Sequence, residues 1–369
     1  MTNQEAIIHN SSFSRRSFLK KGIIGATALS PQLLPAKPVK ASPLLLGFDN
    51  FSIRALQWKA PRLIEFAVEQ KVDSLLLSDL DVYESLDSAY LRELKQEVKK
   101  QNILLQVGTG SICPTSQKFS KKYGSAEEHL KLLIKTAASL GSPVARCYLG
   151  SKKDRMPPLG ISHHIETTLR ELKKVRSYAL DMGVKLAIEN HAGDMHSSEL
   201  IELIEKAGQE FVGATLDTGN ATWTLEDPLE TFRVLAPYAI SSGVRDSMVW
   251  KSRRGAKVQW TALGEGCVDL VRIFQEWAKK CPHCPVQVET ISGFAKEFPF
   301  LEKQFWTAYS TIYAADFASF LRLAHQGKEI PTFSPASGAD QEKKRQAYQL
   351  QELQKSLSYC RTQFAQIKS

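Results

Sequence analysis

Residues 185–217 read KLAIENHAGDMHSSELIELIEKAGQEFVGATLD and contain a complete strand–helix–strand unit. The apolar runs at 185–189 and 213–217 have the length of buried strands. Apolar residues between them recur at the spacing of one helix face: Leu200, Ile201, Ile204 and Ala207. A helix that joins two such strands typically packs on the parallel sheet that contains both of them.

The same alternation of short apolar strands and amphipathic helices runs from residue 44 to residue 290. Eight strands are predicted, at Leu44–Phe48, Ser74–Ser78, Ile103–Val107, Val144–Leu149, Lys185–Glu189, Gly213–Asp217, Ala239–Arg245 and Val286–Thr290. Eight βα units predict a closed (β/α)8 barrel, the TIM barrel of the α/β class. The alternative, an open doubly wound sheet, would need a glycine-rich turn after its first strand, and residues 49–54 contain no glycine.

The first 41 residues have the features of an export signal. Residues 14–20 read SRRSFLK and resemble the twin-arginine export motif, a short apolar stretch follows at 22–29, and Ala41 ends a cleavage site of small residues. The apolar stretch is too short to remain as a membrane anchor. We therefore predict a twin-arginine signal peptide at 1–41 and a periplasmic or otherwise exported protein. A disordered basic N-terminus is the alternative.

The signal peptide changes the meaning of the net charge. The 369-residue chain has a formal net charge of +9, and its first 41 residues hold six basic side chains and one acidic side chain. The remainder therefore carries +4. Because much of the basic excess belongs to the signal, we expect no nucleic-acid partner.

The chain continues well past the eighth strand. Aromatic and apolar residues from Phe300 to Ala324 recur at helical spacing and predict one long amphipathic helix. A Pro/Ser/Gly-rich linker at 326–340 and a polar final helix follow. The predicted organisation is a signal peptide at 1–41, a barrel at 42–295 and a C-terminal helical extension at 296–369. The extension is expected to cover the barrel or a neighbouring subunit, the latter in a homo-oligomer.

Three strands in the second half of the barrel end on a carboxylate: Glu189, Asp217 and Glu289. Side chains alternate along a strand, and each acid falls on the face whose other residues are small or polar. All three are therefore predicted to point into the barrel mouth, where the active sites of such barrels lie. Converging acids repel one another, and a divalent cation relieves that repulsion. Three separate surface acids are the alternative.

Four motifs follow one another along these strands: Ile188-Glu189-Asn190-His191, Leu216-Asp217-Thr218-Gly219-Asn220, Arg245-Asp246 with a later Gly264-Glu265-Gly266, and Glu289. In this order they resemble the motifs of the xylose-isomerase-like barrels. That family includes sugar isomerases, ketose 3-epimerases, inosose dehydratases and apurinic endonucleases. The resemblance covers roughly residues 44–295.

The resemblance implies that Glu189, Asp217 and Glu289 are metal ligands. Such an oxygen set favours Mn²⁺ or Mg²⁺, with Zn²⁺ as a further option. Strand seven departs from the family pattern, because Gly243 stands where the family has a histidine ligand. The fourth ligand is then missing, replaced by water, or supplied from elsewhere, for example by His191 or His196.

The resemblance also implies roles in catalysis. Glu189 and Glu289 are the predicted catalytic residues, because they would flank the reacting carbon and transfer its proton. The predicted substrate-binding residues are His191, Asn220, Arg245 and Arg54. Arg146, at the end of strand four, is expected to make either a structural ion pair or a substrate contact. His191 has a satisfied core histidine as its alternative.

These features predict a divalent-metal-dependent sugar isomerase or epimerase that acts through an enediolate on a sugar or keto-sugar. The expected partner is a small carbohydrate, and export favours free sugars, keto-sugars or glycosides over sugar phosphates. Two alternatives remain open. One is a keto-glycoside lyase or dehydratase on the same metal site, and the other is a non-catalytic carbohydrate-binding barrel.

A Cys281-Pro-His-Cys284 motif resembles that of periplasmic thiol oxidases. It follows a predicted helix and precedes a predicted strand, which is the reverse of the order in a thioredoxin-like site. A local disulfide or two unreactive thiols is therefore predicted.

Overall fold

The structure is a computed structural model and describes residues 44–309, 312–335, 337–338 and 340–367. The predicted signal peptide and its cleavage site lie outside the described residues. Within those ranges, no helix is both long enough and apolar enough to cross a membrane.

Eight parallel strands form the central sheet in the order β10-β1-β2-β3-β4-β5-β6-β7. Their bounds are β1 Leu46–Asp49, β2 Ser74–Leu77, β3 Leu104–Ser111, β4 Val144–Tyr148, β5 Lys185–Glu189, β6 Val212–Asp217, β7 Ala239–Gly243 and β10 Val286–Val288. Val244, directly after β7, joins the two ends of the sheet. Its N–H donates to the Gln287 carbonyl (2.7 Å), and its own carbonyl accepts from the Glu289 N–H (3.0 Å). The predicted (β/α)8 barrel is confirmed.

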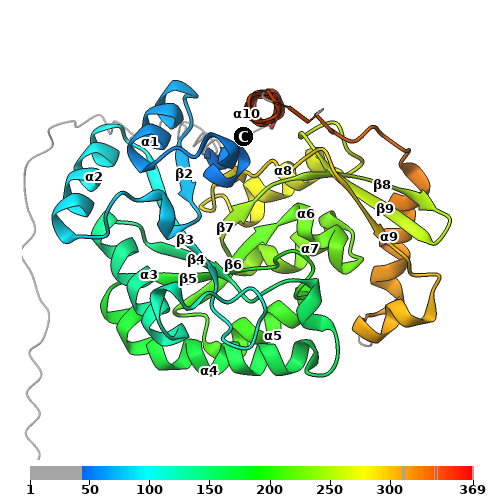
Figure 1. Ribbon diagram of the computed structural model, residues 1–369, viewed down its shortest axis with the longest axis horizontal. Helices are drawn as coiled ribbons and strands as arrows, with labels where there is room; N and C mark the ends of the chain where they lie inside the picture. The colour runs from blue at the N-terminus through cyan, green and yellow to red at the C-terminus, as the bar shows by residue number, and fades with distance from the viewer. Residues whose placement is uncertain (1–43, 310–311, 336, 339, 368–369) are drawn as a thin grey trace, which may run out of the picture. The chain divides into compact units, whose positions relative to one another are not determined.

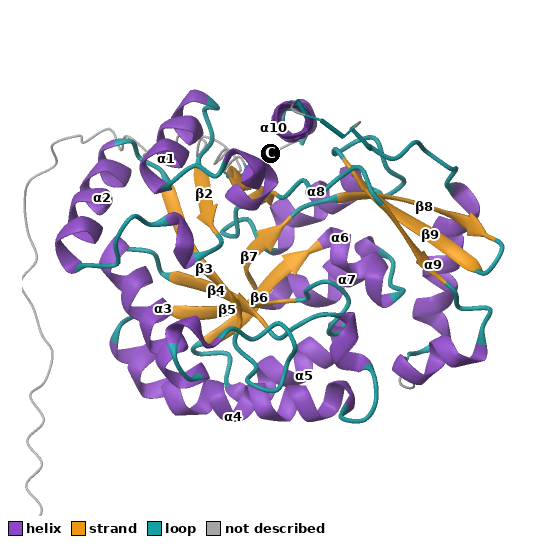
Figure 2. Ribbon diagram, viewed as in Figure 1, coloured by secondary structure: helices purple, strands orange, loops and turns teal. Residues whose placement is uncertain are grey.

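Helices follow the strands and cover the outside of the sheet (Figure 2). The principal ones are α1 Ala60–Glu69, α2 Ser88–Lys100, α3 Ala126–Leu140, α4 Gly160–Asp181, α5 Ser197–Ala207, α7 Pro228–Leu235, α8 Leu270–Lys280 and α10 Gln341–Phe364. The predicted apolar face of α5 is buried, with Leu200 and Ile204 fully enclosed. A capping box at His196 and Glu199 fixes the start of this helix, because it satisfies backbone N–H groups of its first turn.

Helix α10 is the eighth helix of the barrel. It packs against α8, β1, β10 and the 3-10 segment η1 (Asn50–Leu56), and Figure 1 shows it beside the N-terminal part of the barrel. Leu353 and Leu357 are fully buried in the same core cluster as the strands. The segment that the sequence assigned to a C-terminal extension therefore supplies the helix that follows β10.

A second, three-stranded sheet of order β11-β9-β8 lies beyond the barrel strands and was not predicted. It consists of β8 Asp246–Ser252, β9 Gly255–Thr261 and β11 Ala295–Phe298, all antiparallel. Strand seven accordingly ends at Gly243 instead of Arg245, since the chain turns there into the β8–β9 hairpin. Trp250 and Trp260 lie on the two strands of this hairpin.

The single long helix predicted from Phe300 to Ala324 is wrong. The chain forms a 3-10 segment, η7 Lys303–Ala308, and a separate helix, α9 Ala314–Gln326, which packs on β8. The aromatic side chains that suggested one helix instead form a second apolar cluster with β9 and β11, to which Phe300, Phe317 and Phe320 contribute. Helical spacing alone does not distinguish these two arrangements.

Cys281 and Cys284 lie between α8 and β10. Both are buried, and the structure has them as free thiols, one of the two alternatives predicted. The indole N–H of Trp277 donates to the Cys284 carbonyl (2.9 Å), so this segment belongs to the packed core.

Replacement of Leu353 by Ala tests whether α10 belongs to the barrel's cooperative unit. Leu353 is 0% exposed, and its truncation should lower the free energy of unfolding by about 2–5 kcal/mol. The matched control is Leu301→Ala, because Leu301 is 70% exposed and should change it by less than about 0.5 kcal/mol. The measurement is urea denaturation followed by circular dichroism. An unchanged main transition in the Leu353 variant would show that α10 is dispensable.

Candidate active site at the barrel mouth

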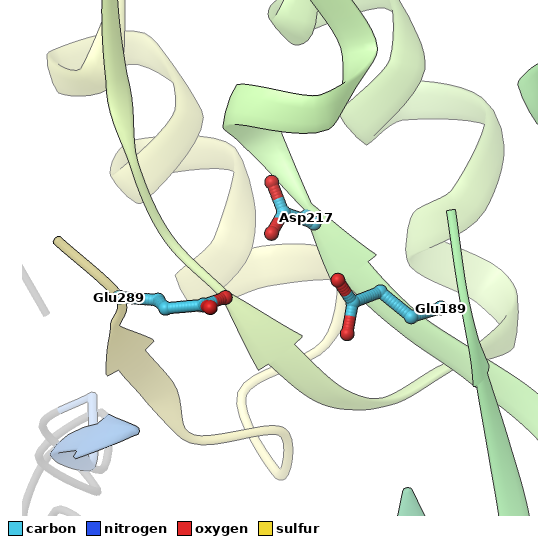
Figure 3. A group of neighbouring side chains, drawn as sticks. All are labelled: Glu189, Asp217 and Glu289. Carbon is cyan, nitrogen blue, oxygen red and sulfur yellow. The ribbon is translucent and has the colours of Figure 1, made fainter. Parts of the chain in front are cut away.

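The three predicted carboxylates converge. Glu189 ends β5, Asp217 ends β6 and Glu289 follows β10, and one oxygen of each lies within 4.8 Å of the others. Figure 3 shows the three side chains pointing toward one another from their separate strands. Exposed fractions of 1%, 0% and 3% show that they are buried. The alternative of three separate surface acids is therefore wrong.

Arg146 on β4 neutralises Glu189. Its Nε donates to Glu189 Oε2 (2.6 Å), and its Nη2 pairs with the same oxygen. Its Nη1 donates to the Thr109 carbonyl (3.1 Å). Of the two roles expected for Arg146, the structure therefore contains the ion pair. The guanidinium also borders the pocket described below.

Arg245 neutralises the other two carboxylates. Its Nη2 lies 2.9 Å from Asp217 Oδ2 and donates to Glu289 Oε2 at 2.5 Å. The side chain is 2% exposed. We predicted a substrate contact for Arg245. The structure places Arg245 in the pocket wall, but its Nη2 is paired with the carboxylates of Asp217 and Glu289.

Three neighbours hold Arg245 in this position. The Thr218 hydroxyl accepts from the Arg245 N–H (2.8 Å) and donates to its carbonyl (2.6 Å). The Trp260 ring lies under the guanidinium, with Cζ 4.4 Å from the ring centroid, and its indole N–H donates to the Gly219 carbonyl. Gly219 leaves room for the aliphatic part of the side chain, because a Cβ there would lie 2.6 Å from Arg245 Cδ.

A fourth buried acid, Asp49, was missed. It ends β1, and its Oδ1 accepts from the Ser78 hydroxyl (2.6 Å) and the Phe51 N–H (2.8 Å). Burial, and secondarily repulsion from Glu289, raises the pKa of Asp49 to about 7. The rule that found the other acids would have found Asp49 as well, had the predicted first strand not stopped at Phe48.

Burial also raises the pKa of Asp217 well above its ordinary value. Arg245 opposes this effect, whereas Glu189 and Glu289 add to it. The mouth thus contains four acids and two guanidiniums, with two of the acids, Asp49 and Asp217, inclined to hold a proton. The two guanidiniums and the protons on these two acids can therefore balance the negative charge at the barrel mouth.

A pocket of about 260 Å³ opens above this cluster. Its polar wall includes Arg146, His191, Asn220, Arg245 and Glu289, and its aromatic wall includes Phe51, Tyr148, Trp223 and Trp260. Of the three converging carboxylates, Glu289 is the one that borders the pocket. Glu189 and Asp217 are buried and do not line the pocket.

His191 and Asn220 lie where the sequence predicted. His191 Nδ1 is 2.6 Å from the Gly150 carbonyl and must donate to it, so the lone pair is on Nε2. Burial, followed by Arg146, lowers the pKa of His191 to about 3, and the ring stacks on Tyr148 at 3.7 Å. The Asn220 Nδ2 donates to Glu189 Oε1 (3.0 Å), while its Oδ1 has no hydrogen-bond partner in the described part of the chain.

Arg54 and His196 lie elsewhere. Arg54 is exposed, donates to the Phe51 carbonyl (3.0 Å) and borders a neighbouring hollow with Thr290 and Tyr348. Its position does not match the predicted substrate contact in the main pocket. His196 caps α5, and its Nε2 faces Glu226 at 3.4 Å, so it is no candidate ligand for the strand-end carboxylates.

Asp246 organises the loop after β9. Its two oxygens accept from the backbone N–H groups of Gly264, Gly266 and Val268. Burial raises its pKa to about 6. The Arg-Asp and Gly-Glu-Gly motifs are thus parts of one structural unit that fixes the hairpin next to the site.

The strand-end carboxylates do not fit a divalent cation as they stand. Metal–oxygen distances are about 2.0–2.6 Å, so an ion shared by Asp217 Oδ2 and Glu289 Oε2 would overlap the Nη2 of Arg245. Both oxygens of Glu189 are likewise engaged, by Arg146 and Asn220. The expected cation site therefore contains a guanidinium.

A model of the xylose isomerase-like TIM barrel family matches residues 64–303. The chain belongs to this family. Among curated proteins it is 24% identical over 142 residues to the uncharacterized protein YihM of Escherichia coli K12, a match that spans 38% of this chain and 40% of that protein.

Solved structures share the fold at low identity. One is a D-psicose 3-epimerase solved in the presence of D-fructose (13% identical, TM-score 0.54, covering 85% of this chain and 99% of that one). Another is a xylose isomerase-like protein from Mycobacterium smegmatis in complex with magnesium (12%, 0.52, 78% and 98%). A third is a probable 3-DHS dehydratase from Bacillus anthracis (14%, 0.51, 66% and 92%).

Replacement of Gly219 by Ala tests the confinement of Arg245. The added Cβ would lie 2.6 Å from Arg245 Cδ, so the free energy of unfolding should fall by about 1–3 kcal/mol. Gly110→Ala is the control in the same pocket, because its Cβ would meet Tyr148 Oη at an ordinary 3.5 Å. Chemical denaturation measures both variants. Equal stability of the two would mean that Arg245 is free to move.

Proposed function

We propose that the protein is a sugar-modifying enzyme that removes a proton from the carbon next to a carbonyl group of a sugar or keto-sugar. The observation that carries this proposal is the position of Glu289, which borders a pocket that two buried guanidiniums also border. A base beside fixed positive charges is the arrangement that proton abstraction next to a carbonyl requires.

Glu289 is the proposed base. Arg245 engages its Oε2, whereas no residue within the described ranges donates a hydrogen bond to Oε1. The carboxylate would take the proton from the substrate carbon, and the electron pair of that C–H bond would move onto the carbonyl oxygen. The product of this step is an enolate, or an enediolate when the neighbouring carbon carries a hydroxyl.

Arg146 and Arg245 would stabilise the negative charge that develops on that oxygen. Both are fixed by buried carboxylates and need not reorient during the reaction, which is the condition under which such charges contribute most. Glu189 then serves mainly to hold Arg146 and Asn220 in place, which differs from the proton-transfer role predicted from the family resemblance.

The remaining pocket residues suit a hydroxyl-rich ligand. The Nε2 of His191 can accept from a substrate hydroxyl, because its Nδ1 donates to Gly150. The unpartnered Oδ1 of Asn220 is a second acceptor. Trp223 and Trp260, stacked at 4.4 Å, form an apolar wall on which a sugar ring can pack.

The second candidate is a dehydratase or glycoside lyase. It shares the first step, after which the enolate expels a hydroxyl group or the aglycone oxygen from the next carbon, and the leaving oxygen takes up the proton that Glu289 has removed, so that water or the free aglycone is released. Epimerisation needs a proton delivered to the opposite face, yet Glu289 alone of the three converging acids borders the pocket. Elimination needs only one carboxylate at the reacting carbon, which favours it here, because the other carboxylate on the pocket wall, Asp79, is exposed.

Export by the twin-arginine route remains part of the proposal. It rests on the SRRSFLK motif at 14–20 and the apolar stretch at 22–29. In an exported enzyme the substrates would be free keto-sugars or keto-glycosides instead of sugar phosphates.

Proton abstraction is tested by exchange with solvent. D-fructose, D-tagatose and a 3-keto-glucoside are incubated with the protein in D₂O, and deuterium at the carbon next to the carbonyl is followed by NMR. We expect the protein to catalyse deuterium exchange either in the free ketoses or in the 3-keto-glucoside. Glu289→Gln should slow this exchange by about 10²–10⁴-fold because the base is lost. Glu265→Gln is the control, since Glu265 is exposed and outside the pocket.

The products separate the candidates. An epimer or isomer with deuterium incorporated supports isomerisation, while release of water or of the aglycone supports elimination. Binding of a sugar without exchange by the folded wild-type protein would contradict the proposal and leave a carbohydrate-binding barrel.

A further inference from the structure

The strand-end carboxylates need a positive charge between them. The backbones of Glu189 and Asp217 are held by strand pairing in the sheet, and the Glu289 N–H donates to the Val244 carbonyl, so the three side chains start from fixed positions around one point. Buried like charges at this spacing are strongly unfavourable unless a cation or protons compensate them.

The cation at this position belongs to the protein. A single nitrogen, Nη2 of Arg245, lies within hydrogen-bonding distance of both Asp217 Oδ2 and Glu289 Oε2. The contact with Asp217 Oδ2 is an ion pair by distance alone, since this oxygen has no hydrogen-bond partner among the described residues, whereas Nη2 donates a hydrogen bond to Glu289 Oε2. One point of positive charge shared by two carboxylates is the arrangement that a metal ion would otherwise provide.

The local sequence confines this guanidinium. The β8–β9 hairpin starts at Asp246, one residue after Arg245, and returns Trp260 to lie under the guanidinium. Trp260 is itself backed by Trp223 and bonded to the Gly219 carbonyl. The side chain would have to leave a close-packed slot between Gly219 and Trp260 to give up its position.

Gly243, the last residue of β7, lies against the same two carboxylates. A Cβ at this position would lie 2.8 Å from Asp217 Oδ2 and 3.0 Å from Glu289 Oε2. With the two carboxylates drawn to Arg245, strand seven has no room for a side chain and hence supplies no ligand to an ion here. Glycine at 243 and arginine at 245 are therefore two parts of one arrangement.

We infer that the guanidinium of Arg245 replaces a divalent cation between Asp217 and Glu289, and that this chain binds no divalent metal at these carboxylates. Removal of the guanidinium would convert them into a cation site. The inference concerns what occupies the site and does not depend on the proposed proton transfer.

Metal binding is measured directly on the purified full chain. Wild type, Arg245→Gln and Arg54→Gln are dialysed against chelator and titrated with Mn²⁺, and the free ion is read by electron paramagnetic resonance. Wild type and the Arg54 control should bind no Mn²⁺ with saturation. Arg245→Gln should bind about one ion per chain and gain thermal stability with Mn²⁺, whereas Arg245→Gln/Asp217→Asn should lose both.

Each outcome of the Mn²⁺ titration either supports or overturns the inference. Saturable binding of one Mn²⁺ by wild type, lost in Asp217→Asn, would overturn the inference. A folded Arg245→Gln variant that binds no Mn²⁺ would also overturn it, since the carboxylates would then be no cation site. If that variant does not fold even with Mn²⁺ present, the wild-type titration decides alone. The D₂O exchange assay run with chelator separates this result from the proposed function, which fails only if exchange is absent in every condition.

Discussion

The pairing of buried strand-end carboxylates with two arginines is the interaction on which the barrel mouth depends. Removal of an ion from water is costly, and a buried acid left without its partner destabilises a protein by about 3–5 kcal/mol. Arg146 engages Glu189, while Arg245 engages Asp217 and Glu289. Neither arginine can be considered apart from the acids, because each group is tolerated in the core only while its partner is present.

Several features away from the mouth follow from this pairing. The β8–β9 hairpin places Trp260 under Arg245, and Asp246 secures the hairpin through the backbone of 264–268. The second apolar cluster, built from β9, β11 and α9, supports the hairpin from outside. The hairpin and the second apolar cluster thus hold Trp260 against Arg245, and Trp260 and Trp223 also line the pocket.

The strand positions and the inward-facing acids could be predicted from the sequence, because both depend on the pattern of neighbouring residues. Strand β5 was predicted to the residue, and the alternation along β5, β6 and β10 placed Glu189, Asp217 and Glu289 on the inner face. The error at Asp49 came from a strand end misplaced by one residue. The partner of Asp217 and Glu289 was not predictable from spacing, since it depends on a hairpin that brings residue 260 back to residue 245. The helix expected from Phe300 failed because aromatic residues at helical spacing also suit a packed cluster outside a helix.

The central claim is that a guanidinium stands where a metal ion would bind, and diffraction tests it most directly. Crystals grown with Mn²⁺ would be measured at the manganese absorption edge. The expected result is continuous density for Arg245 between Asp217 and Glu289, with no anomalous peak there. A peak about 2.2 Å from oxygens of both carboxylates, with Arg245 displaced, would contradict the claim.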